Sequence, residues 1–141
     1  MVTGGAGHIG RAICESLLAQ GAEVIAVGRR EPAEPVAFQG REATFYSADI
    51  RDPAASQALI ESVAERFGRL DILVNNAGGG PPVAADDASA ELTQKIISLN
   101  LLAPLVLSQR TPVRHQSRVY PERFNAHSIP GRKCVQCVKI F

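Results

Sequence analysis

The stretch Thr3-Gly4-Gly5-Ala6-Gly7-His8-Ile9-Gly10 decides how this chain folds. Gly5, Gly7 and Gly10 follow the pattern G-x-G-x-x-G, and an apolar helical pattern begins directly after them. Such glycines allow a sharp turn after a strand, a close approach of the backbone to a pyrophosphate, and tight packing of helix on strand. The amino end of the helix then directs free N–H groups at phosphate. The motif alone is weak evidence, because glycines also serve tight turns that bind nothing.

Short apolar runs alternate with helical patterns over the rest of residues 1–109. Apolar residues recur every four positions from Ile9 to Leu17, which predicts a helix. Asp52-Pro53 predicts a helix start, because Asp accepts bonds from free N–H groups and Pro suits the first helical position. Pro104 is expected to kink the last helix. The expected helices cover residues 8–20, 52–67 and 89–109, and the expected strands residues 1–2, 23–28, 43–48 and 71–75. Residues 29–41 are expected to form a loop, with a short helix as the alternative.

The alternation of strands and helices has the spacing of β-α-β units, which predicts a parallel sheet with helices on both faces. Right-handed crossovers give the strand order 3-2-1-4. We therefore expect residues 1–109 to form an α/β domain, a three-layer, doubly wound parallel sheet of the Rossmann type that is incomplete, with about four strands. Residues 110–141 show neither helical nor strand periodicity, so we expect an irregular basic tail that is not native to the fold.

The composition is that of an ordinary globular protein, with 45% apolar and 21% charged residues. We find no apolar run of about 18 residues and no leader pattern, and therefore expect a cytoplasmic protein without a membrane span. Three cysteines do not form a disulfide framework, which agrees with a reducing compartment. Residues 1–109 carry 8 Lys and Arg against 13 Asp and Glu, whereas residues 110–141 carry 7 against 1. A basic tail can bind nucleic acid, but no recognition motif supports that function here.

Two arginines follow the second expected strand, in Val27-Gly28-Arg29-Arg30. In a dinucleotide site this position lies beside the adenosine ribose, where an acid accepts from a 2′-OH and a cation pairs with a 2′-phosphate. Arg29 and Arg30 therefore favour NADP over NAD. The alternative is a pair of solvated surface arginines.

Four further polar positions have both a structural and a functional interpretation. Asp49 follows the third strand and could meet an adenine edge or cap the next turn. The turn Asn75-Asn76-Ala77-Gly78 could bond its own backbone or a ligand. Asn100 is polar within an apolar helix segment, so its amide is either bonded to backbone or placed for function. His8 could donate to a phosphate or simply face solvent.

The cysteines do not define a site. Cys14 has the pattern of a small core residue. Cys134-Val135-Gln136-Cys137 is a single C-x-x-C pair with His127 as its closest imidazole, which is too little for a zinc or redox motif. We therefore expect no metal site.

Together these residues resemble the short-chain dehydrogenase/reductase family. Thr3-Gly4-x-x-Gly7-x-x-Gly10 resembles its cofactor loop, with the spacing of the extended branch, because His8 stands where the compact branch has its middle glycine. Asn75-Asn76-Ala77-Gly78 instead matches the strand-four signature of the compact branch. Asp49-Ile50 resembles the adenine-contact position, and Asn100 falls where the family keeps the Asn of its catalytic tetrad. The resemblance implies a catalytic role for Asn100 and a cofactor site made of Thr3, Gly4, Gly5, Gly7, His8, Ile9, Gly10, Arg29, Arg30, Asp49, Ile50, Asn76, Ala77 and Gly78.

The resemblance also implies a chemistry, the NADP-linked oxidation of an alcohol or reduction of a carbonyl in a small-molecule substrate, without nucleic-acid or membrane partners. There a Tyr is the general acid/base, a Lys lowers its pKa, a Ser orients the substrate oxygen and the Asn supports a proton relay. The resemblance ends near Gln109, and no Ser followed by Tyr-x-x-x-Lys comes after Asn100; Tyr120 has Phe124 four residues on. We therefore expect this chain to be inactive as it stands. Intact relatives are expected to form homo-oligomers through their fourth and fifth helices, only one of which is recognisable here.

A hypothesis for the abrupt change is that a frameshift or premature junction replaced the catalytic half with unrelated sequence. Another reading frame of the downstream DNA is then expected to encode the Ser and the Tyr-x-x-x-Lys. The alternative functions are a non-catalytic, cofactor-binding remnant and a nucleotide-sugar epimerase or dehydratase-like fragment. The glycine spacing favours the epimerase or dehydratase-like fragment, and Asn75-Asn76-Ala77-Gly78 argues against that alternative. In either case the apolar helix at residues 92–107 is expected to expose a large apolar patch.

Overall fold

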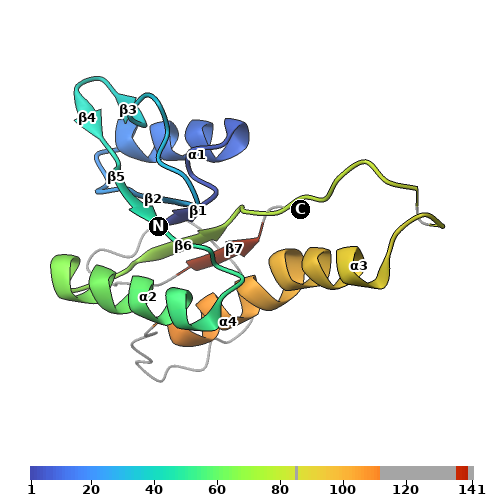
Figure 1. The fold of residues 1–141 in the computed structure, drawn as a ribbon. Coiled ribbons are helices and arrows are strands. Elements are labelled where there is room, and N and C mark those ends of the chain that lie inside the picture. The colour runs from blue at the N-terminus through green and yellow to red at the C-terminus, as the bar shows by residue number, and fades with distance from the viewer. Residues whose placement is uncertain (85, 112–135, 140–141) are drawn as a thin grey trace, which may run out of the picture.

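The computed structural model describes residues 1–84, 86–111 and 136–139, the last four as backbone. Within these residues, five strands form one parallel sheet in the order β5-β2-β1-β6-β7 (Figure 1). In chain order the elements are β1 (Val2–Thr3), α1 (His8–Ala19), β2 (Ile25–Gly28), β3 (Ala37–Phe38), β4 (Arg41–Glu42), β5 (Thr44–Ser47), α2 (Pro53–Phe67), β6 (Ile72–Asn75), α3 (Ala90–Ile97), the π-helical turn η1 (Ser98–Leu102), α4 (Ala103–Arg110) and β7 (Gln136–Lys139).

The sheet separates two hydrophobic clusters, because successive residues of a strand point to opposite faces. Helix α1 covers one face, where Leu18 packs in a cluster with Ala26 of β2. Helices α2 and α4 lie on the other face, where Val27 and Leu73 share a cluster with Leu107 of α4 (Figure 1). The three-layer α/β fold is thereby confirmed. The predicted order 3-2-1-4 is confirmed as β5-β2-β1-β6.

The tail departs from the prediction at β7. Gln136–Lys139 pairs in parallel with β6 from Ile72 to Asn75, so the expectation of an irregular tail is wrong for these four residues. The reason is that an edge strand such as β6 offers a row of unpaired N–H and C=O groups, which any segment with compatible backbone can join. Four residues are too few for a period of two to stand out in the sequence. Tyr120, His127 and Cys134 lie outside the described residues.

Helix α2 begins and ends where its sequence predicts. The Asp52 side chain accepts a hydrogen bond from the amide of Ala54 at 2.8 Å, and Pro53 takes the first helical position. Gly68 ends the helix with a φ of +67°, a left-handed conformation that glycine adopts without a steric penalty.

The last helix runs without a break from Ala90 to Arg110 and contains a feature near Pro104 that the sequence did not predict. The turn before this proline widens into η1, and the amide of Ala103 donates to the carbonyl of Ser98. Proline has no N–H for the usual bond to the carbonyl four residues earlier, so the helix loses α-helical pairing there. By length and composition alone, this helix is also long and apolar enough to cross a membrane, although core helices meet the same criterion.

The predicted loop over residues 29–41 contains a small antiparallel hairpin. Strands β3 and β4 have two residues each and are joined by Gln39 and Gly40, whose φ angles are +48° and +78°. Two residues with positive φ form the turn type that matches the twist of a hairpin. Strands of two residues carry no periodic signal, so their sequence does not predict them.

Candidate functional site

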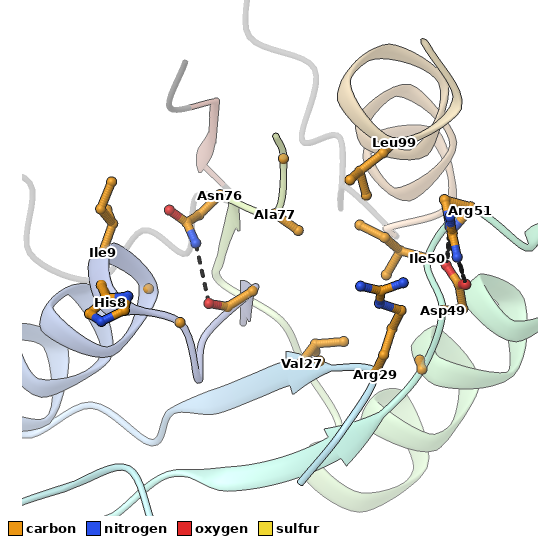
Figure 2. A pocket seen from close by; sticks show the side chains of 16 residues that line it. His8, Ile9, Val27, Arg29, Asp49, Ile50, Arg51, Asn76, Ala77 and Leu99 are labelled. Atoms are coloured by element: carbon orange, nitrogen blue, oxygen red, sulfur yellow. Dashed lines mark hydrogen bonds and ion pairs between the residues drawn. The ribbon is translucent and has the colours of Figure 1, made fainter. Parts of the chain in front are cut away.

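A cleft of about 430 Å³ lies where the carboxyl ends of β1, β2, β5 and β6 meet. This is the edge at which open α/β sheets bind ligands. Figure 2 shows the cleft between the start of α1, the residues after β2 and β5, and the turn after β6. It is lined by Gly4, Gly7, His8, Ile9, Gly10, Val27, Gly28, Arg29, Ala48, Asp49, Ile50, Arg51, Asn76, Ala77, Gly78 and Leu99.

The glycine stretch is tightly closed on itself. A Cβ atom on Gly10 would lie 2.0 Å from the carbonyl oxygen of Gly4, and one on Gly5 would lie 2.9 Å from the Cα of Ala26. Gly4 also has a φ of +66°. Gly5 and Gly10 thus allow the loop to pack on β2 and on itself, whereas Gly4, Gly7 and Gly10 face the cleft.

Thr3 and Asn76 hold the glycine loop to the turn after β6. The buried Thr3 hydroxyl accepts hydrogen bonds from the amides of Asn76 and Ala77, at 3.1 and 3.0 Å. In return, the Asn76 side-chain amide donates to the carbonyl oxygens of Thr3 and Gly4, at 3.0 and 3.4 Å. Thr3 therefore supports the cleft from behind and does not line it.

The amino end of α1 differs from those of α2 and α3. Asp52 and Ser89 cap α2 and α3 with side-chain oxygens, whereas α1 begins at Gly7 without a side-chain cap. The first turn of a helix leaves N–H groups that need an acceptor. His8, Ile9 and Gly10 present this uncapped turn to the cleft, where an anion is the natural acceptor.

Asp49 lies at the far end of the cleft and is paired with Arg51. The Arg51 Nε lies 2.9 Å from Asp49 Oδ1 and its Nη2 lies 2.5 Å from Oδ2. The hydrogen bond from the Arg51 guanidinium lowers the pKa of Asp49 to about 2, with a smaller contribution from the charge of Arg29. The Arg51 amide also donates to Oδ1 at 3.1 Å, so the turn role considered for Asp49 is present in the structure.

The two arginines after β2 have different positions. Arg29 lines the cleft, and Figure 2 shows its guanidinium below Ile50, at the same end of the cleft as the Asp49–Arg51 pair. Among the described residues, its side chain makes no hydrogen bond or ion pair. Arg30 is exposed and does not line the cleft.

Asn100 is bonded to backbone, one of the two possibilities that its position left open. Its Oδ1 accepts from the Gly79 amide at 2.9 Å, and its Nδ2 donates to the carbonyls of Gly79 and Ile96 at 3.0 and 2.9 Å. The side chain thereby connects η1 to the glycine turn that borders the cleft. Asn100 does not itself line the cleft.

Five lining residues are absent from the set predicted from the sequence: Val27, Gly28, Ala48, Arg51 and Leu99. Arg51 carried a signal, because an arginine two residues after an Asp can reach back to its carboxylate. Leu99 lies one residue before Asn100 on a helix whose apolar residues all suggested core packing, so no signal separated it from its neighbours.

Cys14 lies behind the glycine loop, as its interpretation as a core residue predicted. Its buried thiol donates to the carbonyl of Gly5 at 3.7 Å. Burial raises the pKa of the thiol to about 11. The group therefore stays protonated at neutral pH and does not act as a nucleophile.

Comparison with known proteins finds short chain dehydrogenases by sequence profile and by sequence identity. A sequence profile described as "short chain dehydrogenase" matches residues 1–115. A short chain dehydrogenase/reductase of Macrophomina phaseolina is 36% identical over 118 residues, which cover 77% of this chain and 66% of the relative.

Solved structures agree with the sequence comparison. A short chain dehydrogenase of Leptospira borgpetersenii with bound NAD+ superposes with a TM-score of 0.70 at 28% identity, covering 78% of this chain and 42% of the other. An NADPH-dependent 3-quinuclidinone reductase of Rhodotorula rubra gives 0.68 at 30% identity, covering 77% and 44%. The chain thus spans less than two thirds of the length of the relatives that it matches.

Proposed function

Because the chain belongs to the short-chain dehydrogenase family, we propose that it forms the cofactor-binding part of an oxidoreductase that uses NADP(H). The bound cofactor supplies or accepts hydride in such chemistry. The observation that carries the proposal is the cleft itself, which has an uncapped helix start at one end and, at the other, an arginine that is unpaired among the described residues.

The residues at the glycine loop fit a pyrophosphate. The loop has no side chains at three positions that line the cleft, Gly4, Gly7 and Gly10, and a Cβ atom on Gly7 or Gly10 would fill the space beside Gly4. The first turn of α1 offers its N–H groups to phosphate oxygens. His8 lies at the same place and is proposed as a further donor to phosphate.

Arg29 supports NADP over NAD. It stands beside the expected position of the adenosine ribose, where a 2′-phosphate carries close to two negative charges and offers strong acceptors. β2 ends without an acid that would accept from a ribose 2′-OH, since Gly28 is followed by Arg29 and Arg30. Ile50 and Asp49 are proposed to contact the adenine.

The substrate is proposed to be a small alcohol or carbonyl compound. We propose that Asn100 supports the proton relay of an intact active site, through the connection that it makes between η1 and Gly79. Residues 1–141 contain no Tyr-x-x-x-Lys. The function proposed for this chain alone is therefore cofactor binding without turnover, with residues 1–109 as the binding unit and the greater part of 110–141 outside it.

The test is a titration of the purified chain with NADPH and NADH, followed by the fluorescence of the reduced nicotinamide. We expect NADPH to bind more tightly, and Arg29→Gln to weaken NADPH by roughly tenfold while leaving NADH nearly unchanged, since hydrogen bonds between charged groups contribute about 1.5–3 kcal/mol before solvent screening. Arg30→Gln, a neighbouring variant outside the cleft, is expected to have a much smaller effect. Equal affinity for both cofactors would contradict the choice of NADP, and robust carbonyl reduction by the pure chain would contradict the absence of turnover.

A further inference from the structure

One carboxylate and two guanidinium groups share the end of the cleft opposite α1. Arg51 and Asp49 form a two-pronged pair, with Nε 2.9 Å from Oδ1 and Nη2 2.5 Å from Oδ2. Arg29 lines the same end, and its charge acts on Asp49 without a direct contact within 4.0 Å. The side chains of Asp49 and Arg51 are about one-third exposed, at 37% and 32%, so both can be reached by a ligand.

The geometry sets up a competition for Asp49. A carboxylate attracts whichever cation can reach it, and the guanidinium of Arg29 lies at the same end of the cleft as this pair, close enough for its charge to act on Asp49 (Figure 2). While Arg51 occupies both oxygens, the Arg29 donors have no partner in the part of the chain that the structure describes, and the charge of the three groups together is positive. Without Arg51, Asp49 and Arg29 would be left as neighbours of opposite charge, with no net charge between them.

We propose that Arg51 is a positioning residue for cofactor selectivity: by holding Asp49, it keeps Arg29 available for the 2′-phosphate of the adenosine moiety. The role is indirect, because Arg51 acts through the carboxylate and not through its own contact with the phosphate. The inference rests on the proposed function, since it assumes that the cleft takes an adenine nucleotide with Arg29 beside the ribose.

The sharpest test is a selectivity ratio that does not depend on turnover. The full chain is titrated with adenosine 2′,5′-bisphosphate and with AMP, and the two dissociation constants are compared by NMR. Changes in the adenine contact affect both probes alike, so the ratio isolates the 2′-phosphate. We expect Arg51→Gln to reduce the preference for the bisphosphate by roughly fivefold, the upper range for a partly exposed ion pair.

A second variant separates positioning from a structural effect. Adding Asp49→Asn to Arg51→Gln removes the carboxylate that would capture Arg29, so the preference is expected to return toward that of the wild type. Arg51→Lys, which keeps a cation beside Asp49, is expected to retain most of the preference. A double variant that stays as unselective as Arg51→Gln alone would overturn the proposal.

The matched control is Arg69→Gln. Arg69 and Asp71 form the same kind of pair two residues apart, with Arg69 Nε 2.9 and 2.7 Å from the two oxygens, but they do not line the cleft. The control is expected to keep the wild-type ratio, and circular dichroism shows whether each variant is folded.

The outcomes also separate this inference from the proposed function. If the wild type has no preference for the bisphosphate and Arg29→Gln changes nothing, the choice of NADP is wrong. If Arg29→Gln abolishes a clear preference and Arg51→Gln leaves it intact, only the role of Arg51 is wrong.

Discussion

Gly10 and Gly4 approach each other so closely that a Cβ atom on Gly10 would lie 2.0 Å from the carbonyl oxygen of Gly4. Backbone, not a flexible side chain, occupies that space. The contact fixes the start of α1 against the loop that precedes it, and with it the direction of the first helical amides.

Gly10→Ala is therefore expected to displace the loop and abolish cofactor binding. Alanine is the better helix former by about 1 kcal/mol, so helix propensity alone would stabilise the variant. A lower melting temperature together with lost NADPH binding would show that the steric conflict dominates. A variant that melts as high as the wild type and binds NADPH normally would contradict the geometry.

Thr3→Val is expected to destabilise the fold by about 1–3 kcal/mol, because it leaves the amides of Asn76 and Ala77 without the hydroxyl that accepts them. Valine has a similar shape, so the effect reports the lost hydrogen bonds. The measurement is the midpoint of urea unfolding. Thr93→Val at an exposed position of α3 is the matched control, and equal midpoints for the two variants would count against the role of Thr3.

The Asp49–Arg51 pair is expected to make stability depend on pH in acid. The folded pKa of Asp49 is about 2, below the value of about 3.9 for an Asp in an unfolded chain. The unfolded chain therefore binds the proton first, and the contribution of the pair is full above about pH 4 and lost as the pH falls toward 2. Asp49→Asn is expected to flatten the stability curve in that window, measured by urea unfolding at a series of pH values. An unchanged acid slope would contradict the prediction.

The apolar face of the last helix is expected to drive association. Ile97, Leu101, Leu102 and Leu105 are 44–50% exposed, in agreement with the apolar patch predicted from the sequence. Leu101→Gln with Leu105→Gln is expected to raise the concentration at which the chain stays monomeric in light scattering, with little change in melting temperature.

The control for that prediction is Leu107, which is fully buried between α4 and the sheet. Leu107→Ala is expected to cost about 2–5 kcal/mol of stability. If the exposed double variant loses as much stability as Leu107→Ala, the exposed face is packed in solution and the prediction is wrong.

The sequence predicted those parts of the fold that depend on residue chemistry nearby in the chain. Asp52-Pro53 and Gly68 mark the ends of α2 because capping is local, and β2 and the centre of β6 are apolar because they are buried within the sheet. The pairing of β7 could not be predicted, because it depends on which segment meets the open edge of β6 and not on the four residues themselves.

The cleft was predictable to a similar extent. The glycine loop, Arg29 and Asp49 carry their chemistry in their residue types, and the structure brings them to one edge of the sheet. Arg30 and Asn100 were also predicted as site residues from their residue types, but neither lines the cleft. Adjacent arginines look equivalent in a sequence, and only the backbone direction after β2 separates the one that enters the cleft from the one that leaves it.

The π-helical turn η1 changes the angular phase of the helix that contains it. Relative to a continuous α-helix, one additional residue in a turn rotates everything after it by about 100°. The helix can thus turn Asn100 toward Gly79 and still bring Ala103 and Leu107 onto the sheet. Inserting a further residue between Ser98 and Leu102 would put these two orientations out of step, so this short segment is expected to tolerate substitutions far better than insertions.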